Sequence, residues 1–189
     1  MKNQMKNKFF EKISVRKFVL LCVIALLVVA LVCQFAISKA NDGYTLKLKD
    51  GFDKLTVQKG GVQGENSPMT VFEKSGEEWL VRQVVSEDVP AENFKADLNT
   101  CTRIEAFLNK INVVSVVSRS GDDERYGFGE NSIFITASRN GKVVRKIEIG
   151  KNAISGQQVY CRLDGSKEIV LVSGDMRQVF ERDFDSFKM

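Results

Sequence analysis

The sequence predicts an α+β protein in which an N-terminal transmembrane helix precedes a β-rich domain of antiparallel meanders with one packed amphipathic helix. An uncharged apolar run of 20 residues occupies positions 18–37. Short segments of alternating apolar and polar residues, separated by glycine-containing turns, then recur between residues 44 and 173. Only the stretch 97–112 among them repeats apolar residues at helical spacing. Strands, one helix and strands again are the order of an α+β domain.

The apolar run 18–37 is long enough to cross a bilayer as a helix. At about 1.5 Å per residue it spans about 30 Å, the thickness of the hydrocarbon layer. The preceding tail, residues 1–17, has six Lys or Arg and one Glu, which favours a cytoplasmic N-terminus. We therefore expect a single-pass protein of the cytoplasmic (inner) membrane. Its neck would be residues 38–43, and its domain, residues 44–189, would lie in the periplasm or outside.

A cleaved signal peptide is the alternative to an anchor. Ala36-Ile37-Ser38 offers small residues for cleavage. The apolar core of a signal peptide is about 7–15 residues long, shorter than this run, which favours an uncleaved anchor.

Composition excludes several classes of function. Seven of the 28 Lys and Arg and one of the 24 Asp and Glu precede residue 41, so residues 41–189 have 21 and 23, a net charge of −2. Such a domain lacks the basic surface of a nucleic-acid binder. The chain has no histidine, which excludes Ser-His-Asp, Cys-His and HExxH sites. We expect no nucleic-acid partner, no metal, no cofactor and no enzymatic activity.

Alternation and turn residues predict the strands. Asn140-Gly141 is the strongest two-residue hairpin signal, and Ser75-Gly76-Glu77 indicates another hairpin. The glycine-containing loop 60–68 lacks the Lys-Ser/Thr of a phosphate-binding loop, so we interpret it as a turn. The expected strands are 44–49, 55–58, 69–74, 78–83, 113–118, 132–139, 142–149, 158–163 and 169–173.

The predicted helix begins after Asp97, a favoured N-cap residue, and runs to about Asn112. Residues 176–187 are expected to form a short closing helix. Cys101 and Cys161 are the only cysteines of the outer domain. They could pair in one disulfide in an oxidising compartment. Because the geometry of a disulfide is strict, two separate, buried and apolar cysteines are the favoured alternative.

Few residues are candidates for contact with a ligand. Asp122, Asp123 and Glu124 are adjacent, whereas calcium loops space their ligands, so a solvated loop is favoured over a calcium or acid-base site. Tyr126-Gly127-Phe128 is expected to pin this loop onto the core, with Gly127 allowing a tight bend. Trp79, the only tryptophan, is expected to pack beneath the sheet. The candidate ligand or partner contacts are Trp79, Tyr126 and Phe128, and no catalytic, cofactor-binding or metal residue is assigned.

Seven short motifs follow one another in the order of a known bacterial family. They are Glu78-Trp79-Leu80-Val81, Pro90 with Ala96-Asp97, Phe107-Leu108, Val116-Val117-Ser118, Tyr126-Gly127-Phe128, Ile149-Gly150 and Gly156 to Tyr160. With them the chain resembles the domain-of-unknown-function family 4340 over roughly residues 70–175. Its one departure is the extra residues 92–95 before Ala96-Asp97, which leave the start of the helix uncertain.

The resemblance implies a function but no site. Members of the family typically have an N-terminal membrane helix and are often encoded beside ABC transporter parts similar to those of gliding-motility systems. The expected function is therefore a non-enzymatic, membrane-anchored extracytoplasmic interaction module, an accessory component of an ABC-transporter-like membrane assembly. It would touch the lipid bilayer through residues 18–37. An extracytoplasmic small-molecule or cell-wall-fragment binding protein is the alternative, and a carboxylate-based hydrolase is less favoured.

Overall fold

A computed structural model of the chain divides into two compact units, Met1–Asn41 and Asp42–Met189. The described residues are 15–40, 42–60, 67–85, 90–120 and 123–189. Three sequence predictions fall partly or wholly outside them: most of the basic tail 1–17, the central part of the loop 60–68, and Asp122.

The described part of the first unit is one helix, α2 (Val15–Ala40). It contains the predicted run 18–37 and extends through the residues expected to begin the neck. Its stretch Arg16–Ala36 is long and apolar enough to cross a membrane, and none of it is buried by the rest of the chain. Because a helix satisfies its own backbone hydrogen bonds, this segment suits a lipid environment. By its length and composition, a helix of this kind near the N-terminus can serve as a membrane anchor or a signal sequence.

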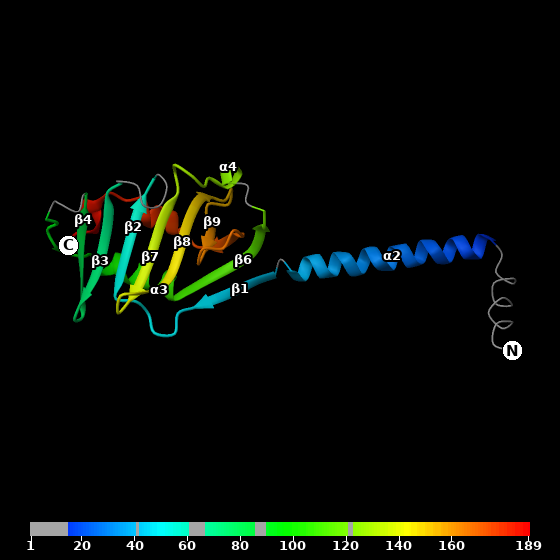
Figure 1. Cartoon of the computed structure of the whole chain (residues 1–189), viewed down its shortest axis with the longest axis horizontal. Coiled ribbons are helices and arrows are strands. Elements are labelled where there is room, and N and C mark those ends of the chain that lie inside the picture. Colours follow the sequence, from blue (N-terminus) through cyan, green and yellow to red (C-terminus); the bar gives the residue numbers. More distant parts are fainter. Residues whose placement is uncertain (1–14, 41, 61–66, 86–89, 121–122) are drawn as a thin grey trace. The chain divides into compact units, whose positions relative to one another are not determined.

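In its described residues, the second unit is built on one ten-stranded sheet, ordered β1-β6-β10-β9-β8-β7-β2-β3-β4-β5 (Figure 1). Every neighbouring pair is antiparallel. Two four-stranded meanders, β2–β5 and β7–β10, therefore meet where β2 pairs with β7. The strands are β1 (Asp42–Lys47), β2 (Lys54–Lys59), β3 (Met69–Ser75), β4 (Glu78–Val84), β5 (Phe94–Lys95), β6 (Lys110–Ser118), β7 (Ile133–Arg139), β8 (Lys142–Asn152), β9 (Gln158–Leu163) and β10 (Ile169–Ser173).

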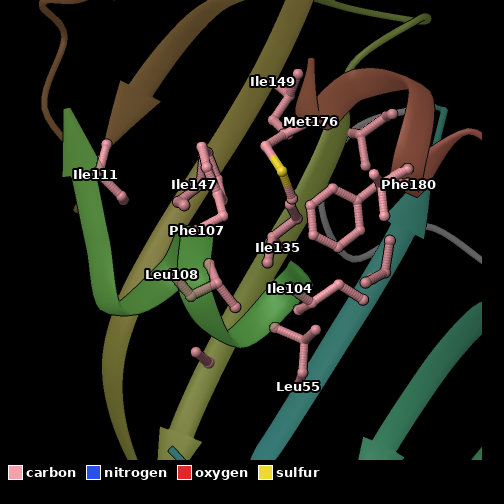
Figure 2. Packing of buried hydrophobic residues seen from close by; sticks show 14 of the residues in the cluster. Leu55, Ile104, Phe107, Leu108, Ile111, Ile135, Ile147, Ile149, Met176 and Phe180 are labelled. Atoms are coloured by element: carbon pink, nitrogen blue, oxygen red, sulfur yellow. The ribbon is translucent and has the colours of Figure 1, made fainter. Parts of the chain in front are cut away.

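Each meander is followed by a helix, and both helices pack on the same face of the sheet. These are α3 (Leu98–Asn109) and α5 (Met176–Phe180). Figure 2 shows their apolar side chains against those of the central strands. Removal of this apolar surface from water is the main contribution to stability. Labelled members of the cluster are Leu55, Ile104, Leu108, Ile135, Ile147, Ile149, Met176 and Phe180.

The predicted start of the central helix is confirmed and its predicted end is wrong. Asp97 caps α3: its Oδ2 accepts hydrogen bonds from the Thr100 backbone N–H at 2.9 Å and the Thr100 hydroxyl at 2.6 Å. The helix ends at Asn109 instead of Asn112 because β6 begins at Lys110, where Ile111 pairs with Leu46 of β1. Pairing of Lys110 and Ile111 with β1 outcompetes another helical turn.

Two further expectations need correction. Residues 176–187 do not form one helix: α5 ends at Phe180, and a separate 3-10 turn, η1, spans Phe184–Phe187. Asp183 between them is extended, and the Lys59 amine donates hydrogen bonds to the carbonyls of Glu181 and Arg182. A single helical turn, α4 (Asp123–Tyr126), stands where a loop was expected.

The hairpin and cysteine predictions can also be compared with the structure. Asn140 and Gly141 have φ angles of 49° and 76°, as the expected two-residue turn between β7 and β8 requires. Cys101 and Cys161 are both buried and free, so the interpretation as separate apolar residues is confirmed.

Replacing Leu108 by Ala should lower the free energy of unfolding by about 2–5 kcal/mol, because the side chain is fully buried and leaves a cavity. Leu98→Ala in the same helix is the matched control, since Leu98 is 68% exposed and its loss should change stability by less than about 0.5 kcal/mol. Chemical denaturation of the full chain in detergent measures both. Equal effects would contradict the described burial of α3.

Replacing Asp97 by Ala should lower the melting temperature most at neutral pH. The hydrogen bonds from Thr100, that of the hydroxyl first, lower the pKa of Asp97 below its ordinary value of 3.8. This stabilisation is therefore complete above pH 3.8 and is lost as the pH falls through the folded-state pKa. Asp97→Asn, which keeps an N-cap acceptor but does not titrate, should be closer to wild type at pH 7. If the difference in melting temperature between Asp97→Ala and wild type grew as the pH was lowered, the role of the Asp97 carboxylate as N-cap would be contradicted.

Candidate functional site

The sheet face opposite α3 and α5, here called the outer face, bears a continuous row of side chains. Gln58, Phe134, Glu148 and Arg162 lie opposite one another on β2, β7, β8 and β9. Side chains alternate between faces along a strand, and those on adjacent strands lie about 4.5–5.5 Å apart at Cβ. Three consecutive strands and β2, which is distant from them in sequence, thus build one surface.

A hollow of about 440 Å³ opens on this face over β7, β8 and β9. The turn after β9 lies along its side. We call it the outer hollow, and the lining residues used below are Ser120, Phe134, Lys146, Glu148, Arg162 and Lys167.

The outer hollow contains an ion pair that the surrounding chain holds in place. Arg162 Nη1 lies 3.2 Å from Glu148 Oε2, and the two side chains are only 17% and 19% exposed. Ser132 Oγ donates to Glu148 Oε1 at 3.1 Å. The Arg162 guanidinium lies 4.5 Å from the centre of the Phe128 ring, within the range of a cation–π contact. The pair is thus oriented from several sides, with its charges compensated.

The segment Tyr126–Phe128 is docked on the same face beside this ion pair. Phe128 is buried, and the Tyr126 and Tyr160 rings meet edge to face with their centres 4.8 Å apart. A Cβ at Gly150 would lie 2.4 Å from the Tyr126 carbonyl oxygen and 3.1 Å from the Phe128 ring, so only glycine fits there. Tyr126-Gly127-Phe128 therefore pins its segment to the sheet as predicted, but to the outer face instead of the core cluster. Three of the sequence motifs meet in this place.

Trp79 lies elsewhere and does not share a site with Tyr126 and Phe128. It is 6% exposed on β4, with its ring centre 5.5 Å from that of Phe52, so the expectation that it packs beneath the sheet is confirmed. β3, β2 and β7 separate β4 from β8, which is about 19 Å at normal strand spacing. This position favours a structural role for Trp79, and contact of Tyr126 and Phe128 with a ligand stays a prediction.

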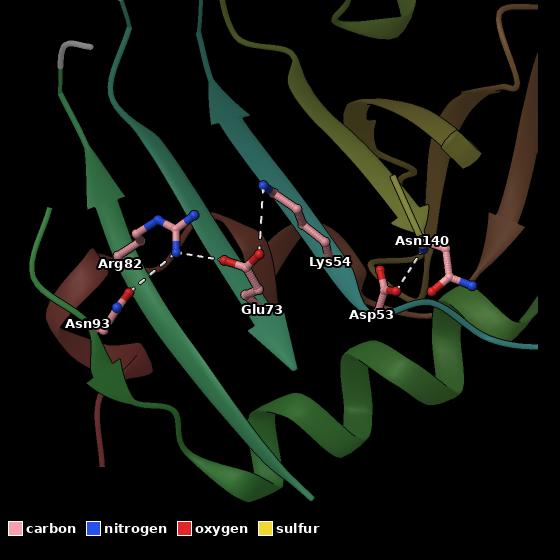
Figure 3. A network of polar contacts seen from close by, with 6 residues as sticks. All are labelled: Asp53, Lys54, Glu73, Arg82, Asn93 and Asn140. Carbon is pink, nitrogen blue, oxygen red and sulfur yellow. Dashed lines mark hydrogen bonds and ion pairs between the residues drawn. The ribbon is translucent and has the colours of Figure 1, made fainter. Parts of the chain in front are cut away.

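The other half of the outer face carries a second polar network (Figure 3). Glu73 on β3 lies 2.7 Å from Arg82 on β4 and 3.9 Å from Lys54 on β2. Arg82 also donates to the Asn93 side chain at 3.4 Å. These partly exposed charges compensate one another, and pairs of this kind contribute little to stability.

Two kinds of reactive group, metal ligands and thiols, can be checked in the described residues. Within them no group of three or more His, Cys, Asp or Glu is placed to hold a metal ion. Burial raises the pKa of Cys101 to about 11 and that of Cys161 still further, so both thiols are protonated and poor nucleophiles at neutral pH.

Sequence reasoning missed Lys146, Glu148 and Arg162, the residues that define the outer hollow. Their signal was present: on β8 and β9 these polar positions alternate with the buried Ile147, Ile149 and Cys161. The alternation assigns them to the outer face, but only the strand order brings them together.

The fold defines a β-rich α+β domain with one covered sheet face and one bare face, in a chain with an apolar helix near its N-terminus. Residues 89–188 match the family described as Domain of unknown function (DUF4340), and the chain belongs to this family. The match agrees with the resemblance found from the motifs. It includes every lining residue of the outer hollow used here, whereas β2, β3 and β4 precede it. Comparison with curated proteins and with solved structures gave no match.

Replacing Gly150 by Ala should dislodge the segment Tyr126–Phe128, because the new methyl group would overlap the Tyr126 carbonyl. We expect a loss of about 1–3 kcal/mol in the free energy of unfolding and faster hydrogen exchange at residues 124–128. Gly76→Ala is the control: nothing lies within 4 Å of its Cβ position, and any cost comes from its φ of +65°. Unchanged exchange in Gly150→Ala would contradict the docking described here.

Proposed function

We propose that this chain is a membrane-anchored, extracytoplasmic interaction module without enzymatic activity, and that it binds its partner through the outer face. The proposal rests on the outer hollow, which lies on the sheet face that neither α3 nor α5 covers. One face of the sheet is fully used by the hydrophobic core. The other presents charged and aromatic side chains around a depression, the usual character of a recognition surface.

The apolar helix and the family resemblance support the cellular setting of this proposal. Residues 18–37 within α2 would hold the chain in the lipid bilayer of the cytoplasmic membrane, with the N-terminus inside. The resemblance points to subunits of an ABC-transporter-like membrane assembly as the partner. An anchored domain meets such a partner in two dimensions, so modest affinity through a surface of this size is sufficient.

A small molecule or a cell-wall fragment is the second candidate for the occupant of this face. The volume of the outer hollow, about 440 Å³, falls within the range of about 300–1,000 Å³ typical of small-molecule sites. This alternative predicts a ligand held at the hollow without a protein neighbour.

The proposal is tested by placing a photo-crosslinking residue at Lys146 of the full-length chain in its native membrane. Lys146 is exposed on the outer face. The matched control places the same residue at Arg103, which is exposed on α3 of the covered face. We expect a protein adduct from position 146 and not from 103.

The identity of the adduct separates the alternatives. A membrane-protein subunit supports the interaction module, and an adduct of non-protein mass supports ligand binding. Equal adducts from both positions, or none from position 146, would refute binding through the outer face.

A further inference from the structure

We infer that the outer hollow binds an acidic segment of the partner protein, with carboxylates against Lys146 and Lys167 and an apolar side chain on Phe134. This inference rests on the proposed function and names the chemistry of the partner.

Glu148, the one carboxylate among the lining residues, is paired with an arginine, and so are Asp164 and Glu168 at the two ends of the turn beside the hollow. These pairs compensate the carboxylate of the lining and the two acidic side chains of the β9–β10 turn. The N···O distances are 3.2 Å for Arg162–Glu148, 2.9 Å for Arg145–Asp164 and 3.3 Å for Arg119–Glu168.

The two lysines differ from these arginines. Within the described residues neither Lys146 nor Lys167 has an ion-pair partner, although both line the hollow. Lys146 projects from β8 on the outer face, and Lys167 lies in the turn between β9 and β10. With Arg162 and Glu148, the lining has three cations and one carboxylate, a net charge of +2.

This local charge is opposite in sign to that of the domain. Residues 41–189 have a net charge of −2, so the outer hollow is a positive depression in a slightly negative protein. A concave site lined by one sign of charge concentrates ligands of the other sign. The expected ligand is therefore anionic.

The size and lining of the hollow favour a peptide segment over a simple anion. A volume of about 440 Å³ equals the liquid volume of about fifteen water molecules, more than one phosphate or carboxylate requires. Phe134 supplies an apolar surface, opposite Glu148 and one row from Lys146. The hollow is open to solvent, so a chain segment can place a carboxylate and an apolar side chain in it side by side.

The inference is tested with p-benzoylphenylalanine in place of Phe134 in the full-length, membrane-embedded chain. The crosslinked peptide of the partner is then sequenced by mass spectrometry. The experiment is repeated with Lys146→Glu and Lys167→Glu combined. The control combines Lys110→Glu and Lys142→Glu, which makes the same change of net charge at exposed lysines that do not line the hollow.

We expect an adduct on a segment rich in Asp and Glu. Its yield should fall at least about tenfold in the Lys146–Lys167 variant and change less than about twofold in the control. Far-UV circular dichroism checks that both variants are folded. If the double Lys→Glu variant is unfolded, the single variants Lys146→Gln and Lys167→Gln are used instead, and each should also lower the adduct yield.

Two results would overturn the inference and leave the proposed function standing. One is a crosslinked partner segment without acidic residues, or an adduct yield that does not change when Lys146 and Lys167 are both replaced by Glu. The other is a protein adduct from position 146 but none from position 134. Absence of adducts from both positions would overturn the inference and the proposed function together.

Discussion

The burial of α3 and α5 against one face of the sheet is the constraint on which the rest of the domain depends. Both helices follow a four-stranded meander, and both return to the same side (Figure 1). Leu108 and Phe180 are completely buried there. Because the helices share one face, the fold leaves the other face open to polar side chains, and a recognition surface can occupy it without loss of core packing.

Arginine and lysine have different places in this domain: Arg162 lies on the outer face, whereas Arg145 faces the covered side of β8 and Arg177 belongs to α5. Arg145 is buried, and Arg162 and Arg177 are nearly so; each pairs with a carboxylate. Arg177 also donates to the Gly150 carbonyl, beneath the docked segment Tyr126–Phe128. The planar guanidinium suits such fixed, multiple contacts, whereas a lysine amine remains hydrated and mobile. Arg162 thus organises the outer face and Arg145 and Arg177 the covered side, whereas Lys146 and Lys167 have no ion-pair partner among the described residues.

The sequence contained most of the local structure and little of the site. The existence of most strands followed from alternation and from turns such as Asn140-Gly141, which depend only on neighbouring residues. The limits of β1, predicted as 44–49, and of β8, predicted to end at 149, were wrong, and the short β5 was not predicted. The N-cap at Asp97 was predictable because it also depends only on neighbouring residues. The early end of α3 was not, because Lys110 and Ile111 pair with β1, a strand far away in the sequence. The outer hollow depends on the order of β7, β8 and β9 and on the turn that flanks them. Sequence alone therefore identifies its residues only as polar positions on strands.

The pairing of β2 with β7 also shows that the segment matched to the family is shorter than the folded domain. The segment 89–188 that identifies DUF4340 begins after β4, so it includes β7 but not its neighbour β2. It also lacks Leu55, Phe72 and Val81 of the core. Taken alone, it would expose a seven-residue strand edge and one side of its hydrophobic cluster, both of which promote association. In any relative recognised by this segment and built in the same way, an earlier part of the chain or another polypeptide has to supply the missing strands, and the unit of recognition is smaller than the unit of folding.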